Sequence, residues 1–190
     1  MAMETADTLL SDIERLRRRT RTDLHPTWFP LVVFGTLSMA SAAVAVRFGP
    51  TALGFFWAVA APLGSVATGF YYWRRQDRVG LKAPAAPYLV GAAGIVLGAF
   101  LTGGLGGALG APAVSALGPP LFVSAGYLLF ARLARSRGLA AVAVALALVT
   151  LATGVARIPS DRAAWTLALI YGAVFVATGL VFRASQTGGP

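Results

Sequence analysis

Six long apolar stretches constrain this chain more than any other feature, because stretches of this length with few charges can cross a lipid bilayer as helices. Short polar segments separate them and carry most of the charged residues. A helix over residues 28–46 would measure about 28 Å, which is close to the thickness of the hydrocarbon core. The expected spans are 28–46, 52–73, 86–109, 113–133, 139–156 and 163–182. The sequence therefore predicts an all-α integral membrane bundle of six transmembrane helices.

The composition also indicates a membrane protein. Hydrophobic residues make up 57% of the 190 residues and charged residues 12%, whereas about 25% charged residues are usual in a soluble domain. A net charge of +9 would suggest nucleic acid binding in a soluble protein. Here the basic residues stand at the ends of apolar stretches, so we expect them to bind anionic lipid headgroups and no nucleic acid. The chain has no cysteine, which leaves no disulfide or thiolate metal site.

Basic residues fall mainly on one side of the expected membrane. With six spans, 13 of the 16 Lys and Arg residues lie on the side of the N-terminus, and Arg47, Arg157 and Arg162 lie on the other. Cytoplasmic segments of membrane proteins are enriched in Lys and Arg, so we predict a plasma-membrane protein with both termini in the cytoplasm. The residues expected to set this topology and to contact headgroups are Arg15, Arg17, Arg18, Arg19, Arg21, Arg74, Arg75 and Arg78.

The two ends of the chain lie outside the expected transmembrane domain of residues 27–183. In residues 1–26, Leu9, Ile13 and Leu16 recur at helical spacing and the arginines follow. This pattern predicts a short basic amphipathic helix on the cytoplasmic membrane surface. A docking helix for a partner or a second copy is the alternative. Residues 184–190 are expected to form a short cytoplasmic tail.

The stretch 86–109 is unusually rich in glycine. Two pairs, Gly94 with Gly98 and Gly103 with Gly107, have the small-xxx-small spacing that lets another transmembrane helix approach closely. We expect these four glycines and Gly91 to be helix-packing positions. So many glycines also favour a central helix that is packed on several sides.

Prolines interrupt two of the stretches at mid-span. Pro62 is expected to kink the second stretch, and Gly118-Pro119-Pro120 to break the fourth. Such breaks are tolerated where they face protein or a water-filled cavity. Hydroxyl side chains lie nearby, and Ser65 and Ser124 join the prolines as candidates for a kink or a cavity. The hydroxyls of the spans could equally serve as hydrogen bonds between helices.

The six stretches can be grouped as three tandem hairpins. Val66-Ala67-Thr68-Gly69 in the second stretch is matched by Val176-Ala177-Thr178-Gly179 in the sixth, and more loosely by Ser124-Ala125-Gly126 in the fourth. An aromatic residue and an arginine follow in each case. This pattern suggests a threefold repeat of a two-helix unit, although an Ala- and Gly-rich sequence also produces such matches by chance.

The residues that usually carry chemistry in membranes are missing from the expected spans. All seven acidic residues lie outside them, and the single histidine, His25, lies at the cytoplasmic end of the first. Embedded carboxylates and histidines form the usual proton relays and metal sites. We therefore expect no enzyme, cofactor or metal.

The favoured function is a non-enzymatic accessory or scaffold subunit, with a membrane protein partner or as a homo-oligomer. The alternative is a facilitator or transporter of a neutral or apolar small molecule.

The N-terminal segment carries a resemblance. Residues 12–19, Asp-Ile-Glu-Arg-Leu-Arg-Arg-Arg, are followed by Trp28-Phe29-Pro30-Leu31 and an apolar span. In these residues and in composition the chain resembles small uncharacterised multi-pass membrane proteins of high-GC actinobacteria. The resemblance implies a bacterial plasma membrane and no particular activity.

Overall fold

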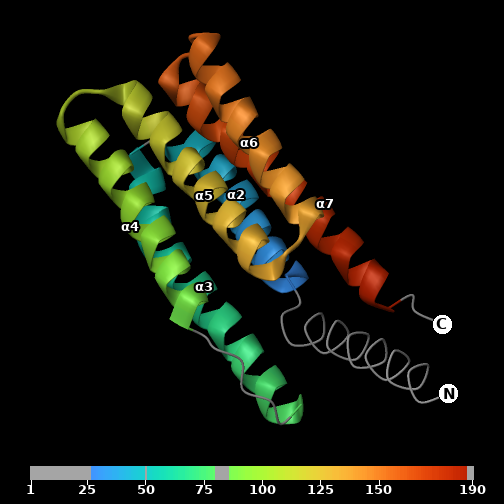
Figure 1. Cartoon of the computed structure of the whole chain (residues 1–190). Helices are drawn as coiled ribbons and strands as arrows, with labels where there is room; N and C mark the ends of the chain where they lie inside the picture. The colour runs from blue at the N-terminus through green and yellow to red at the C-terminus, as the bar shows by residue number, and fades with distance from the viewer. Residues whose placement is uncertain (1–26, 50, 80–85, 188–190) are drawn as a thin grey trace, which may run out of the picture.

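A computed structural model describes residues 27–49, 51–79 and 86–187. The expected amphipathic helix over 1–26, with its five arginines and His25, lies outside these residues. The described part contains six helices and no strand (Figure 1). They are α2 (Trp28–Phe48), α3 (Thr51–Val79), α4 (Ala86–Ala108), α5 (Pro112–Ala134), α6 (Arg137–Val155) and α7 (Ser160–Thr187). All six are long and apolar enough to cross a membrane. The expected all-α bundle of six helices is confirmed, and the chain is a multi-pass membrane protein.

Two helices run beyond their expected spans. α3 continues past Trp73 to Val79, so that Arg74, Arg75 and Arg78 lie in its last turns. α7 continues to Thr187, so part of the expected tail is helical. A helix that leaves the hydrocarbon core can keep its internal backbone hydrogen bonds, which makes apolar length a poor guide to helix ends. We call the end of the bundle where α2 begins the near side, and the opposite end the far side.

The helices are arranged in two layers of three. α2 packs between α3 and α7, while α5 packs between α4 and α6. In Figure 1 the layer of α4, α5 and α6 lies in front of the layer of α3, α2 and α7. Contact between the layers runs mainly through α5 and α7, because α3 meets α4, and α6 meets α7, over only a few residues.

This packing corrects two expectations. α4 lies at the edge of the bundle rather than at its centre, because its glycines receive side chains from α5 alone. The packing also does not follow three equivalent hairpins, since α6 packs on α5 and α7 packs on α2. The three glycines of the proposed repeat have different surroundings: Gly69 faces open space, Gly126 faces α4, and Gly179 faces α2.

The most extensive helix pair joins the first and last helices of the described chain. A Cβ atom at Gly35 of α2 would lie 2.9 Å from the carbonyl oxygen of Gly172 in α7. Ser38 donates a hydrogen bond of 2.9 Å from its hydroxyl to the carbonyl of Ala168 in α7. Ala168 and Gly172 have small-xxx-small spacing, so the sequence carried a signal for this contact.

The prolines do not break their helices. α5 is continuous through Pro119 and Pro120, and α3 is continuous through Pro62. The expected break in the fourth span is therefore wrong. A proline removes one backbone hydrogen bond, and packing against neighbouring helices can compensate for that loss inside a membrane protein. α5 has such neighbours on both sides, and Gly118 lets Thr102 of α4 approach closely.

Candidate functional site

Tyr171 is the centre of a buried polar cluster between the two layers. Its side chain is 4% exposed and its hydroxyl lies 2.7 Å from the Ser124 hydroxyl of α5 and 2.7 Å from the Thr150 hydroxyl of α6. The carbonyl oxygens of Pro120 and Leu146 both lie 3.1 Å from the same Tyr171 oxygen. One tyrosine of α7 thus bonds to two of the three helices of the facing layer, α5 and α6.

The cluster can satisfy its hydrogen bonds with the protons that it contains. A phenol hydroxyl donates one hydrogen bond and can accept others. Ser124 can donate to Tyr171, while Tyr171 donates to the carbonyl of Pro120 or Leu146. Thr150 then donates to Tyr171 or, over 2.9 Å, to Leu146. The arrangement is therefore a closed structural network that fixes α7 against α5 and α6.

Sequence reasoning found Ser124 but missed Tyr171. A signal was present in the sequence. Tyrosine is enriched at membrane interfaces, whereas Tyr171 lies near the middle of its apolar stretch. A tyrosine at that depth needs a hydrogen-bond partner. Leu146 and Thr150 could not be assigned from sequence, since their contact with Tyr171 depends on how α6 is placed.

The second proline candidate lies far from this cluster. Pro62 and Ser65 are on exposed faces of α3, and α3 makes no substantial contact with α5. The two sets of kink or cavity candidates, one on α3 and one on α5, therefore do not come together. Position along the chain gives the depth of a residue but not the face on which it lies.

The candidate glycines of α4 fall on two faces. Gly91 and Gly98 are buried against α5, where Cβ atoms would meet the rings of Phe130 and Phe122. Gly94 is exposed, and a Cβ there would meet no atom within 4 Å. Gly103 and Gly107 are looser, with neighbours of a built Cβ at 3.4 and 3.9 Å. The close contacts therefore follow Gly91, Gly98 and Gly106, where a Cβ at Gly106 would lie 2.6 Å from the backbone nitrogen of Ser115, rather than the two expected pairs.

Hydroxyl side chains divide between two uses. Ser38 and Ser115 donate to carbonyls of other helices, the latter to Gly103 over 2.8 Å. Thr102 and Thr153 donate to carbonyls of their own helix. The Thr68 hydroxyl of α3 is buried without a hydrogen-bond partner among the described residues. The expected role as hydrogen bonds between helices thus holds for some of these residues only.

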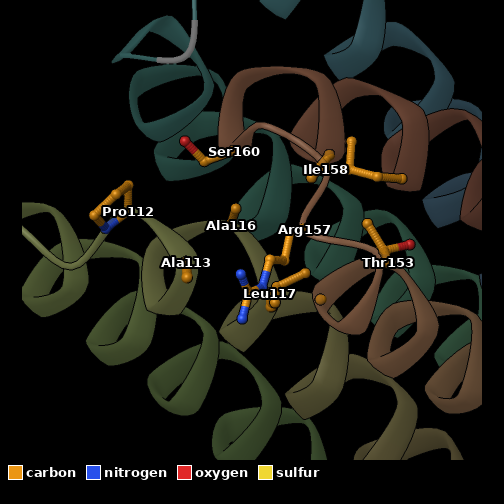
Figure 2. Close-up of a pocket in the computed structure, with 10 residues that line it drawn as sticks. Pro112, Ala113, Ala116, Leu117, Thr153, Arg157, Ile158 and Ser160 are labelled. Carbon is orange, nitrogen blue, oxygen red and sulfur yellow. The ribbon is translucent and has the colours of Figure 1, made fainter.

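A pocket opens at the far side, where α5 and α7 begin and α6 ends (Figure 2). Its volume is about 270 Å³, slightly below the usual range for sites that hold drug-sized ligands. Small and apolar residues form most of its wall, together with Thr153, Ser160 and Arg157. The complete lining is Pro112, Ala113, Ala116, Leu117, Thr153, Gly154, Arg157, Ile158, Ser160 and Ala163.

Aromatic and basic side chains gather at the near side. The rings of Phe29 and Tyr71 stack with centroids 4.1 Å apart. The guanidinium of Arg183 at the end of α7 lies 5.1 Å from the ring centroid of Trp28 at the start of α2. Arg74 lies 4.6 Å over Phe70. Aromatic rings beside arginines are typical of a membrane–water interface.

No group of three or more His, Cys, Asp or Glu side chains gathers within the described ranges. Comparison with protein-family models, with curated proteins and with solved structures found no match to this chain.

Proposed function

We propose that this membrane protein is a non-enzymatic accessory or scaffold subunit that binds a transmembrane helix of another membrane protein through the outer face of α4. The proposed setting is a bacterial plasma membrane with both termini in the cytoplasm, as the distribution of basic residues predicts.

The observation that carries this proposal is a second packing face on α4. Gly94, Leu97, Leu101 and Gly104 follow each other at spacings of three and four residues, and all four are exposed. Cβ atoms at Gly94 and Gly104 would meet no other atom of the described chain within 4 Å. The two glycines of this face are therefore open to a partner helix, whereas Gly91 and Gly98 on the other face are already packed against α5.

Contact with lipid alone does not explain why an exposed helix face contains glycines. Apolar burial does not drive helix association inside a membrane, where close van der Waals packing at small residues does. A glycine within a helix also costs up to about 1 kcal/mol relative to alanine. A partner helix that approaches Gly94 and Gly104 would offset that cost through close contact.

The test is purification from the native host in a gentle detergent, followed by native mass spectrometry. We expect a stoichiometric protein partner with the wild-type chain and its loss with the double variant Gly94→Leu, Gly104→Leu. Both positions have open space around them, so the double variant should keep its fold. The matched control is Gly54→Leu in α3, which also has no neighbour within 4 Å of a built Cβ and should retain the partner.

A solitary monomer from the wild type would contradict the proposal. Retention of the partner by the double variant would place the contact elsewhere and reject the α4 face. A complex that contains only further copies of this chain would replace the partner by a homo-oligomer.

A facilitator of a small molecule is the second candidate, and the far-side pocket favours it. The pocket lies between α5, α6 and α7, one turn above the level of Thr150 in the Tyr171 cluster. A solute that entered there would have to separate Tyr171 from Ser124 and Thr150 to cross the layer contact. Uptake by proteoliposomes, compared between wild type and Tyr171→Phe, tests this reading.

A further inference from the structure

The far-side pocket has one charged group among its lining residues. Arg157 lies in the turn that follows α6, and its side chain lies beside Leu117 of α5 (Figure 2). Asp161 is the acidic residue nearest to it in sequence, yet no ion pair joins the two in the described ranges. A guanidinium without a carboxylate partner is available to an anionic ligand.

Arg157 also occupies a backbone position that favours glycine. Its φ is 52°, and its N–H donates to the carbonyl of Gly154 over 3.1 Å while that of Ile158 donates to Thr153 over 3.5 Å. These two bonds form the helix-ending motif in which glycine is the usual residue at the left-handed position. This turn at the edge of the pocket therefore carries an arginine where glycine would be less strained.

The same strain occurs at Arg135 on the near side, where φ is 53°. Strain alone therefore does not indicate a site. Arg157 differs from Arg135 because it lines the pocket. The comparison supplies a matched control, since replacement by glycine relieves the backbone at both positions and threatens the fold at neither.

The remaining wall of the pocket suits an apolar chain. Ala113, Ala116 and Leu117 lie in the first two turns of α5, and Leu117 is about 7.5 Å below the start of that helix at the usual rise per residue. Gly154 keeps α6 close to this wall, because a Cβ there would lie 2.8 Å from the Leu117 side chain. The charge stands at the membrane boundary and the apolar wall lies inside it.

We propose that the far-side pocket binds a single-chain anionic amphiphile, with its carboxylate or phosphate head on Arg157 and its alkyl chain against Ala116 and Leu117. The small volume selects a short or partly inserted chain over a two-chain lipid. This site is independent of the partner-binding face on α4, so either proposal can fail without the other.

The experiment is photo-crosslinking in lipid nanodiscs with a diazirine analogue of decanoate, compared with the same analogue of decanol. Mass spectrometry then maps the labelled residues. We expect the acid to label the pocket segments of α5 and α6 about tenfold more than the alcohol, which corresponds to one charge-assisted hydrogen bond. Arg157→Gly should remove this preference, and Arg135→Gly should retain it.

A pocket-filling variant and a competition experiment test the same site further. Ala113→Phe fills the pocket and should abolish labelling there by both probes, whereas Val114→Phe, at an exposed neighbour outside the lining, should not. Unlabelled decanoate and decyl phosphate are added separately as competitors, and the stronger one identifies a carboxylate or a phosphate head. Either result supports the proposal.

Three results would overturn it. Equal labelling of the pocket segments by acid and alcohol would remove the role of charge. Unchanged labelling in Arg157→Gly would remove the role of this arginine. Competition by inorganic phosphate as strong as that of the decyl anions would show that the alkyl chain contributes nothing.

Discussion

One tyrosine hydroxyl joins the two layers of this bundle at the residue scale. Tyr171 brings α7 into hydrogen-bonding contact with Ser124 of α5 and Thr150 of α6. Around it, Phe175 packs edge-on against Tyr171 and lies 4.5 Å from Tyr127 between ring centroids. Aromatic packing therefore lies directly beside the polar contact.

Replacement of Tyr171 by phenylalanine should destabilise the bundle by about 1 kcal/mol. The change removes only the hydroxyl and leaves those of Ser124 and Thr150 with fewer partners, and hydrogen bonds between transmembrane helices contribute on this order. The measurement is thermal unfolding in one detergent, followed by circular dichroism. The control is Tyr127→Phe, since the Tyr127 hydroxyl makes no hydrogen bond within the described ranges. Equal unfolding temperatures for the two variants would contradict the role of the cluster.

At the element scale, glycines decide how closely the helices approach. The pair α4 and α5 interlocks in both directions, with Phe122 against Gly98 and Ile95 against Gly126. The pair α2 and α7 instead brings backbones together at Gly35 and Gly172. In each layer, glycines therefore allow the closest contact between two helices.

Alanine substitutions on α4 should have opposite effects on its two faces. Gly98→Ala places a methyl group against the ring of Phe122 and should destabilise by about 1–3 kcal/mol, the usual cost of overpacking. Gly94→Ala meets open space and should stabilise by up to about 1 kcal/mol through helix propensity. Thermal unfolding of both variants in the same detergent checks this. A shift of the same sign at both positions would contradict the assignment of the two faces.

At the scale of the whole molecule, the sequence predicted well the number of membrane-spanning helices that the described residues contain. Apolar length and charge placement determine which segments cross a bilayer, and these properties are local. The neighbours of each helix were predicted poorly. α4 was expected at the centre and lies at the edge, because glycine content does not specify how many helices pack on a segment. The kink or cavity candidates Pro62 and Pro119 lie on helices that do not contact each other, because depth does not specify which face meets which helix.

The candidate site illustrates the same limit. Ser124 could be proposed from its mid-span position, but its partners come from α6 and α7, which are distant in the sequence. The pocket at the far side was not expected, since it depends on the meeting of two helix beginnings and one helix end. Arg157 was recognised only as one of three basic residues on the far side.

The central claim is that the chain crosses the membrane six times with both ends on one side. Single-cysteine labelling in intact cells tests it most directly. The chain has no cysteine, so each introduced thiol is unique. A membrane-impermeant maleimide should label Leu109→Cys and Ala156→Cys at the far side in intact cells. It should label Ala134→Cys and Ser185→Cys at the near side only after permeabilisation. Labelling of both a far-side and a near-side position in intact cells would contradict the six-span topology.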